Sequence, residues 1–434
     1  MSATHSPPAA ARLNEIEGPP TPPTTPPRTA PTAEPTQRPQ KGFEDEPDNP
    51  LARLSPEQLE QLGREFDAIH EEVYAELGDR DSRYIRSTIK LHRQLVLAAR
   101  AMLLGSRYRP LWLGGTAALS VAKILENMEI GHNVMHGQWD WMNDPDINSQ
   151  NWDWDTASPA DAWRHSHNYE HHTFTNIRGK DRDLGYEIMR IDPHQKWHPV
   201  YLLQPFYNLI LMGFFEWGVA LHDLNFDAIR AGEKSKGKVN KELKAIGVKA
   251  RKQVVKDYIA FPLLSAAAAT LASGRDGSLA ERRSSAGRNF KATLAANFTA
   301  NIVRNVWAYS IIFCGHFPDQ TYTFSQAEVE NETRGGWYVR QLLGSANIDG
   351  GPLFHLLAGN LSFQVEHHLY PDMPSSRYSE IAPRVREICR RYGLPYNTGP
   401  LSKQLGTVHR TILRLAFPGG KVRPKPGPYR PEHV

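Results

Sequence analysis

The first periodic hydrophobic pattern in the chain begins at Ser55. In the stretch SPEQLEQLGREFDAIHEEVYAEL, the apolar residues recur at helical spacing. Ser55 is a favourable helix cap, Pro56 fits the first helical turn, and Glu57 places an acid in that turn. The pattern therefore predicts an amphipathic helix at the start of the folded region.

Longer apolar stretches follow, and none is a clean run of the ~20 apolar residues that a membrane-spanning helix needs. Mean hydropathy over the chain is −0.53, which is typical of a soluble protein. Each stretch, taken alone, fits either a membrane segment or a buried helix of a soluble core. The stretches are residues 88–106, 111–131, 200–222, 258–273 and 289–315.

The first two of these stretches flank the short turn RYRP, which predicts a helical hairpin. Residues 200–222 form the longest nearly uncharged stretch, although it contains Pro205 and Glu216. Residues 258–273 are short for a span, and 289–315 carry Arg304 midway.

Both ends of the chain are polar and rich in proline. Residues 1–50 carry too little apolar surface to offset chain entropy, so we predict a disordered Pro-rich N-terminal tail. This tail has no apolar region of the signal-peptide type. Residues 418–434 predict a shorter, basic disordered tail, which leaves 51–417 as the expected folded domain.

Charge and cysteine content narrow the class of protein. The formal net charge of +4 is modest for 434 residues and does not indicate a nucleic-acid partner. The two cysteines, Cys314 and Cys389, argue against a disulfide scaffold and favour a reducing compartment. We expect both to be buried apolar thiols.

Three short groups of histidines, each beside an apolar segment, carry the candidate chemistry. His132 and His136 are four residues apart, and so are His167 and His171, so each pair should share one helical face. One such pair is weak support for a metal site, but three groups favour a polynuclear one. The groups are GHNVMHGQ (His132, His136), RHSHNYEHH (His167, His171, His172) and QVEHH (Gln364, His367, His368).

The ligand chemistry restricts the metal. Imidazole suits iron, copper, zinc and nickel, whereas magnesium and calcium prefer oxygen ligands. Seven histidines exceed the four ligands of a structural zinc, so two metal ions are expected. No cysteine lies near the groups, which argues against an iron–sulfur cluster.

The three groups can share metals only if they lie on one side of the membrane. An even number of crossings must then separate the second group from the third, yet three apolar stretches lie between them. The intervening basic segment holds ten Lys or Arg against two Glu, which favours a cytoplasmic location. We therefore expect 200–222 to lie in the membrane interface or to dip into the membrane and return, with 258–273 and 289–315 forming a spanning hairpin. A solvated basic helix on a soluble protein remains the alternative for the basic segment.

This topology adds an eighth candidate ligand. His316 in IIFCGHFPD would lie at the cytoplasmic end of the last crossing, in the same plane as the three histidine groups.

The motifs H-x-x-x-H at 132–136, H-x-x-x-H-H at 167–172 and Q-x-x-H-H at 364–368 resemble the three histidine boxes of membrane fatty acid desaturases. The resemblance covers most of residues 60–410. Three sequence segments are similar to those of the actinobacterial acyl-CoA desaturases, the stearoyl-CoA Δ9 group in particular. They are KILENMEIGHNVMHGQWDWMNDP, IIFCGHFPD and GNLSFQVEHHLYPDMPS. Because glutamine also opens the third box of front-end desaturases, the Δ9 position is an expectation only.

The resemblance implies an all-α integral membrane protein with about four transmembrane helices in two hairpins. A cytoplasmic helical cap would hold a histidine-rich di-iron site. Gln364 would act through a water molecule or from outside the ligand sphere. The implied iron ligands are His132, His136, His167, His171, His172, His316, His367 and His368.

The implied reaction uses O2 and two electrons to introduce a cis double bond into a fatty acyl chain, carried by CoA or by a lipid. An unactivated methylene has no acidic proton, so a metal must perform the hydrogen abstraction that side-chain acid–base chemistry cannot. The chain carries neither a cytochrome b5-like HPGG motif nor a nucleotide-binding glycine loop. A separate ferredoxin-, rubredoxin- or cytochrome b5-type protein with its reductase is therefore expected, at the bacterial plasma membrane.

Two other functions remain open at this stage. A fatty acyl or alkane hydroxylase would use the same di-iron scaffold, and product analysis separates it from a desaturase. A metal transporter or non-redox metal-binding membrane protein would be expected to hold its ligands mid-membrane, within its helices. Here the histidines lie at helix ends, which favours the enzyme.

Several further residues fit either a functional or a plain structural role. Asp181 and Asp183 would orient ligand imidazoles or belong to a solvated loop. Arg304 would pair with an acid or meet the acyl headgroup. His165 is out of register with its box and is excluded. Tryptophans near the boxes would line a substrate tunnel or serve packing: Trp139, Trp141, Trp152, Trp154 and Trp163.

Overall fold

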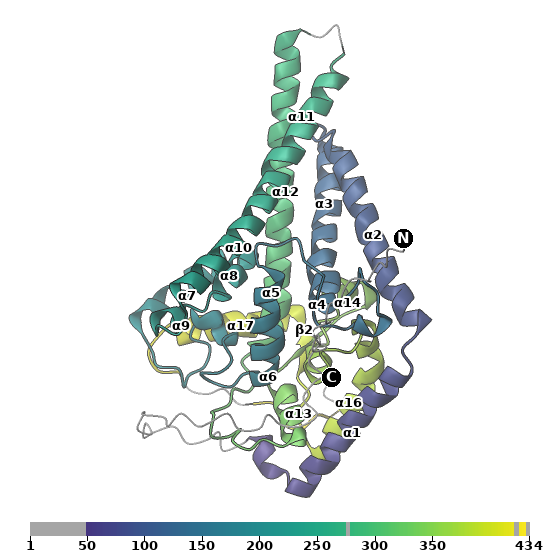
Figure 1. Ribbon diagram of the computed structural model, residues 1–434. Helices are drawn as coiled ribbons and strands as arrows, with labels where there is room; N and C mark the ends of the chain where they lie inside the picture. Colours follow the sequence, from purple (N-terminus) through teal and green to yellow (C-terminus); the bar gives the residue numbers. More distant parts are fainter. Residues whose placement is uncertain (1–48, 275–277, 421–424, 431–434) are drawn as a thin grey trace, which may run out of the picture.

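The computed structural model describes residues 49–274, 278–420 and 425–430 (Figure 1). The described chain is mostly helical, with a tall stalk of long helices above a wider cap of shorter ones (Figure 1). The expected N-terminal tail lies almost entirely outside the described residues. Of the expected C-terminal tail, Tyr429 is described, and its backbone N–H donates to Leu394 O at 2.9 Å.

The amphipathic helix expected after Ser55 is α1 (Pro56–Ala75). Ser55 accepts from the backbone of Gln58, whose side chain in turn accepts from the backbone of Ser55, so both caps are satisfied. One face of α1 is buried against α13 (Arg334–Leu343). The approach is close because a Cβ atom on Gly335 would lie 1.9 Å from a backbone oxygen of α1.

Two helical hairpins form the stalk, as the apolar stretches predict. The first pairs α2 (Asp79–Leu103) with α3 (Arg109–Leu125), and the second pairs α11 (Phe261–Ala272) with α12 (Leu279–His316). α3 also packs on α12, so the two hairpins lie side by side (Figure 1).

The basic segment and the following apolar stretch are one continuous helix. α10 (Lys236–Val254) runs through a π-helical turn, η7 (Val255–Ala260), directly into α11. Among the described residues, this 37-residue helix, Lys236–Ala272, is the one long and apolar enough to cross a membrane. The other stalk helices carry too many polar residues for that test, so four crossings remain a prediction.

Residues 200–222 do not form one long helix. They comprise η6 (Pro199–Leu203), α7 (Gln204–Gly213) and α8 (Phe215–His222), with a break at Phe214. Phe206, Leu209 and Ile210 on α7 are each more than 60% exposed. Two short helices with an exposed apolar face fit a segment that lies along a membrane surface instead of crossing it.

The cap contains the remaining short elements. Its helices are η1 (Pro50–Arg53), η2 (Glu126–His132), α4 (Asn133–Met135), η3 (Asp140–Met142), α5 (Ala160–Trp163), η4 (Arg164–His171), α6 (His172–Phe174), η5 (Leu184–Glu187), α9 (Phe226–Arg230), α14 (Pro352–Leu357), α15 (Gln364–Leu369), η8 (Ser375–Arg377), α16 (Tyr378–Tyr392) and α17 (Leu401–Leu415). Its two strands, β1 (Asn347–Asp349) and β2 (Thr398–Pro400), pair in parallel.

The largest apolar cluster lies between α1, α13, α15 and α16. A second one lies where the lower end of α12 meets α7, α8 and α17. Cys389 belongs to the first and Cys314 to the second, and both are buried free thiols, as expected. The two clusters flank the third histidine group, which is carried by α15.

Candidate metal centre

Four separate elements bring the sequence-predicted histidines together at the junction of stalk and cap. The first group lies at the lower end of the helix that continues α3, the second in η4 and α6, and the third in α15. His316 is the last residue of α12. Segments more than two hundred residues apart in the sequence therefore meet at one place.

The two histidine pairs differ in local helix geometry. The backbone N–H of His136 donates to His132 O at 3.1 Å, so the first pair is one α-helical turn apart, as its spacing predicts, whereas His167 and His171 both lie in the π-helix η4. A π-helix has wider turns and commonly marks a functional site. The rings of His167 and His171 nevertheless lie on one face, with their centroids 5.0 Å apart and nearly parallel.

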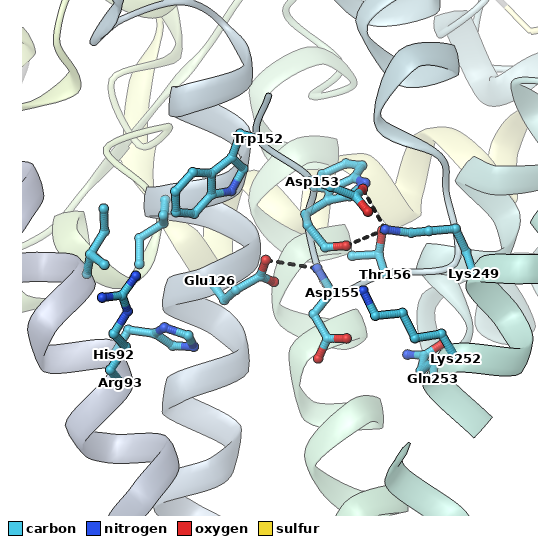
Figure 2. Close-up of a pocket in the computed structure, with 13 residues that line it drawn as sticks. His92, Arg93, Glu126, Trp152, Asp153, Asp155, Thr156, Lys249, Lys252 and Gln253 are labelled. Atoms are coloured by element: carbon cyan, nitrogen blue, oxygen red, sulfur yellow. Dashed lines mark hydrogen bonds and ion pairs between the residues drawn. The ribbon is translucent and has the colours of Figure 1, made fainter. Parts of the chain in front are cut away.

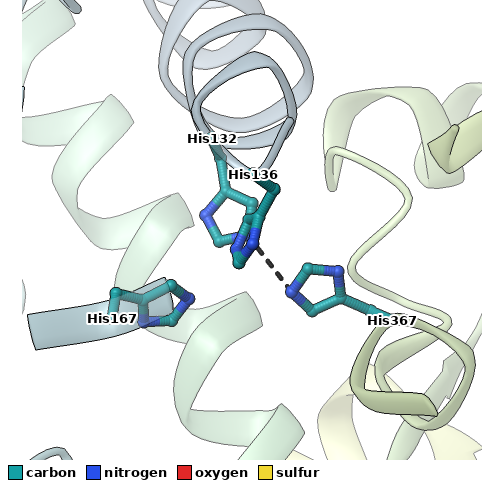
Figure 3. Close-up of side chains that lie close together, drawn as sticks. All are labelled: His132, His136, His167 and His367. Carbon is teal, nitrogen blue, oxygen red and sulfur yellow. Dashed lines mark hydrogen bonds between the residues drawn. The ribbon is translucent and has the colours of Figure 1, made fainter. Parts of the chain in front are cut away.

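The histidines form two neighbouring groups, and Figure 3 shows the first. In it, one ring nitrogen from each of four histidines lies within 4.8 Å of the others; its members are His132, His136, His167 and His367. The second group meets the same criterion with His171, His316 and His368. The closest nitrogen pairs are His132 Nε2 to His367 Nε2 at 3.4 Å and His368 Nε2 to His316 Nε2 at 3.1 Å.

His172 lies between the two groups. Its ring centroid is 4.7 Å from that of His136 in the first group and 4.4 Å from that of His368 in the second. Gln364 lies at the edge of the second group, where its Nε2 is 2.9 Å from His316 Nε2. All eight predicted histidines and the glutamine are therefore in one buried cluster.

The ring nitrogens of this cluster fit a cation. Buried nitrogens without a hydrogen-bond partner among the described residues are His136 Nε2, His167 Nε2, His171 Nε2, both nitrogens of His172, and His316 Nδ1. Such orphaned atoms are costly in a protein interior unless something else satisfies them. Burial lowers the pKa of His132, His136 and His367, so these imidazoles are neutral and each offers a lone pair.

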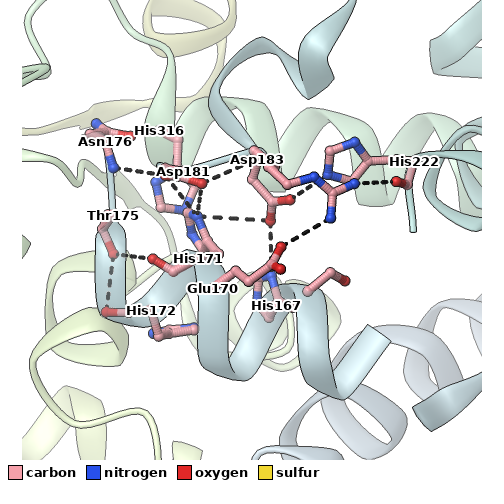
Figure 4. Close-up of polar contacts among 12 residues, drawn as sticks. His167, Glu170, His171, His172, Thr175, Asn176, Asp181, Asp183, His222 and His316 are labelled. Atoms are coloured by element: carbon pink, nitrogen blue, oxygen red, sulfur yellow. Dashed lines mark hydrogen bonds and ion pairs between the residues drawn. The ribbon is translucent and has the colours of Figure 1, made fainter. Parts of the chain in front are cut away.

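Two aspartates hold the second histidine group from behind (Figure 4). Both carboxylate oxygens of Asp181 lie 3.1 Å from His171 Nδ1, and Asp183 Oδ2 lies 3.2 Å from His167 Nδ1. Burial pushes the pKa of His171 down, but the charge of Asp181, its hydrogen bond to the ring and the charge of Asp183 together outweigh burial, and the net shift is upward. Each carboxylate thereby fixes a ring so that its Nε2 faces the cluster.

His222, the last residue of α8, joins the same network. It is buried, and its Nε2 lies 2.9 Å from Asp183 Oδ1. The sequence offers no signal for this contact because His222 and Asp183 are 39 positions apart.

The third group is held by residues that sequence reasoning missed. Tyr378 OH lies 3.1 Å from His367 Nδ1, and Gln341 Oε1 lies 2.9 Å from His368 Nδ1. Both contacts come from other helices, α16 and α13, so no motif near the histidines could reveal them.

The remaining candidates lie outside the cluster. His165 is mostly exposed, in keeping with its exclusion. Arg304 is buried and forms an ion pair with Glu216 of α8, so it has a packing partner. Among the tryptophans, Trp163 stacks on His167 with a centroid distance of 4.6 Å.

Comparison with known proteins agrees with this geometry. The family model described as fatty acid desaturase matches residues 110–400, which include all three histidine groups. The NADPH-dependent stearoyl-CoA 9-desaturase of Mycobacterium tuberculosis is 45% identical over 373 residues, covering 86% of this chain and 83% of the relative. The sn-1 linoleoyl-lipid 6-desaturase of Synechocystis is 24% identical over 357 residues, covering 79% of this chain and 90% of that relative. No solved structure matches the chain.

The chain belongs to the fatty acid desaturase family. It is accordingly an oxidoreductase of lipid metabolism that acts on fatty acyl chains.

Proposed function

We propose that this protein is a membrane-bound acyl-CoA desaturase that uses two iron ions, O2 and two electrons to introduce a cis double bond, at position 9 of stearoyl chains. The observation that carries the proposal is the buried double cluster of histidines with unpartnered ring nitrogens. The choice of CoA, stearoyl chain and position 9 rests on the similarity to the stearoyl-CoA 9-desaturase of Mycobacterium tuberculosis.

In this proposal, His132, His136, His167 and His367 hold one iron, and His171, His316 and His368 hold the other. His172 completes the set from its position between them. Gln364 contacts His316 and acts beside the ligands, not as one of them. Imidazole ligands suit iron, and these two groups consist of histidines alone, while Asp183 lies beside His167 and His171 as part of a third, overlapping group.

When bound, the iron pair supplies the oxygen activation that removes hydrogen from unactivated methylenes. The protein's own contribution is to fix the orientation of the imidazoles through Asp181, Asp183, Gln341 and Tyr378, and to exclude water. The buried position of the cluster serves the last of these purposes.

The arrangement in the membrane follows the same proposal. The two stalk hairpins cross the plasma membrane of a bacterium, and the cap with its histidines faces the cytoplasm. The folded domain spans 51–417, and a separate ferredoxin-, rubredoxin- or cytochrome b5-type carrier with its reductase delivers the electrons. Support comes from the basic helix α10 beside the cap and from the exposed apolar face of α7.

The test is expression of the full chain in a host that lacks the activity, followed by fatty acid profiling with location of the double bond. We expect a new 9-unsaturated C18 acid, which His171→Ala abolishes. A hydroxylated product would replace the desaturase proposal by a hydroxylase, and product from His171→Ala would remove that residue from the ligands.

A further inference from the structure

The helical segment that leads into the first histidine group is held by two sets of contacts. One lies at a pocket of about 290 Å³ beside the stalk, where Glu126 accepts from the backbone N–H of Asp155 at 2.9 Å (Figure 2). In the other, the buried carboxylate of Glu129 accepts from the hydroxyl of Ser375 at 2.7 Å. Ser375 follows the third histidine group in the chain, so the second set joins the first group to the surroundings of the third.

Gln138 makes a second link of this kind, and its side chain is fully buried. Its Oε1 accepts from the backbone N–H of Ser375 at 2.9 Å. Its Nε2 lies 3.1 Å from the backbone oxygen of Pro371 and 3.0 Å from the hydroxyl oxygen of Tyr378. Gln138 closely follows His136 in the chain, so an amide beside the first histidine group contacts three residues that come after the third.

Two backbone groups decide which way the amide of Gln138 points. A backbone N–H can only donate, so the atom that faces Ser375 must be the amide oxygen. A backbone oxygen can only accept, so the atom that faces Pro371 must be the amide nitrogen. That nitrogen also has Asn133 Oδ1 at 3.3 Å, which is a further acceptor. Gln138 therefore directs a donor, and not an acceptor, to the hydroxyl of Tyr378.

The hydroxyl of Tyr378 has one hydrogen and three polar neighbours. Gln138 donates to its oxygen, and the backbone oxygen of Tyr370, 3.1 Å away, accepts its hydrogen. The third neighbour is His367 Nδ1, at 3.1 Å. Because the hydroxyl hydrogen is directed to Tyr370, the hydroxyl oxygen accepts from His367, and Nδ1 carries the proton of that ring. The Nε2 of the neutral ring then has a free lone pair.

The freed nitrogen faces the other rings of the first group, since His367 Nε2 lies 3.4 Å from His132 Nε2 (Figure 3). The partner of His367 Nδ1 is uncharged, because burial raises the pKa of Tyr378 well above its ordinary value. His171, in contrast, is held by the carboxylate of Asp181. A hydrogen bond between neutral groups is about half as strong as one to an ionised group. Tyr378 therefore depends on its own neighbours to keep its oxygen in place.

We propose that Gln138 is a positioning residue of the metal centre and that it acts through Tyr378. It holds the phenolic oxygen where that oxygen accepts from His367 Nδ1, and so keeps His367 Nε2 free for a metal ion. Gln138 is itself held by the backbone of Ser375 and Pro371. A residue beside the first histidine group thus orients a ring of the third. The inference rests on the metal site of the proposed function and adds a residue that supports it.

The test measures the iron(II) affinity of the purified full-length protein in detergent, by competition with a coloured chelator. Four proteins are compared: the wild type, Gln138→Met, Tyr378→Phe and the double variant. Each single variant should bind iron about tenfold more weakly, the lower limit for residues that orient ligand imidazoles. The double variant should also lose about tenfold, because Gln138 acts through Tyr378, whereas independent contributions would multiply to about a hundredfold. Gln150→Met, at an exposed glutamine farther along the same loop, should bind iron as the wild type does.

The unfolding midpoint of the metal-free proteins separates positioning from packing. A Gln138→Met variant with a lower midpoint but the iron affinity of the wild type would overturn the inference, and so would a hundredfold loss in the double variant. If Gln138→Met does not fold, Gln138→Asn replaces it with the same expected losses, because its amide is too short to contact Ser375 and Tyr378 together. Multiplied losses in a protein whose wild type binds two irons overturn this inference alone, whereas a wild type that binds no iron overturns the proposed function as well.

Discussion

At the scale of single residues, the orientation of the histidine rings depends on a few buried contacts. Asp181 contributes most, since both of its oxygens approach His171 Nδ1 and it also accepts from the backbone N–H of Asn176 and of Asp183. It is 4% exposed, so water does not replace these contacts.

We expect Asp181→Asn to lower metal affinity about 10- to 100-fold, because residues that orient ligand imidazoles contribute that much. Iron per chain in the purified protein, measured by mass spectrometry during chelator titration, gives the readout. Asp161→Asn, whose side chain is 94% exposed, is the matched control. Equal iron retention by both variants would show that Asp181 has no orienting role.

Gly315 makes room for Gln364. A Cβ atom at position 315 would lie 2.8 Å from both Cγ and Cδ of Gln364, which is itself buried against His316. Gly315→Ala should destabilise the protein by about 1–3 kcal/mol through overpacking. Gly287→Ala on the same helix meets nothing within 4 Å and should leave the thermal midpoint unchanged or slightly higher. Equal midpoints for the two variants would contradict the packing described here.

The sequence predicted which histidines lie together, but it predicted few of the residues that hydrogen-bond their rings. Residue type and spacing identified the seven histidines of the three groups, because repeated pairs of imidazoles are typical of metal sites, and the expected topology added His316. Tyr378 and Gln341 are ordinary residues of amphipathic helices, and their contacts with His367 and His368 depend on how those helices pack. Asp181 and Asp183 could be suggested from the sequence only because they follow the second group closely.

At the scale of the elements, a buried ion pair links α12 to α8. Arg304 is 1% exposed and pairs with Glu216, which also accepts from Gln253. Removal of one partner of a buried pair leaves an uncompensated charge.

Arg304→Met should therefore lower the free energy of unfolding by about 3–5 kcal/mol. The double variant Arg304→Met/Glu216→Gln should recover part of this loss, because the new amide is neutral and can still accept from Gln253. Thermal unfolding in detergent measures both, and Arg288→Met, near the start of α12, is the control. A double variant as unstable as Arg304→Met would argue that the pair matters through packing alone.

The helices differ from the sequence prediction at the point where the basic segment is followed by an apolar stretch. The basic residues of 236–254 and the apolar residues after 257 suggest two segments, yet both favour helix, so the chain continues without a break as α10, η7 and α11. The π-helical turns of η2 and η4 could not be predicted, because π-helical turns are rare and the sequence pattern of these segments also fits an α-helix.

At the scale of the whole molecule, the proposal requires the stalk to cross the membrane, so that the tip of the stalk and the cap lie on opposite sides of it. The tip of the second hairpin lies at the far end of the stalk from the cap (Figure 1). Both native cysteines are buried, so they give little background in labelling experiments.

Ser284→Cys near that tip should react with a membrane-impermeant maleimide added to intact cells, whereas Glu71→Cys on α1 should react only after the cells are opened. Both positions are exposed. Labelling of the two positions from the same side would contradict the proposed crossing of the stalk.

The account as a whole depends on two irons bound by imidazoles from four separate elements. Anomalous diffraction at the iron edge from crystals of the iron-loaded protein measures this most directly. Two peaks are predicted, one among His132, His136, His167 and His367 and the other among His171, His316 and His368. A single peak, or iron bound away from these rings, would contradict it.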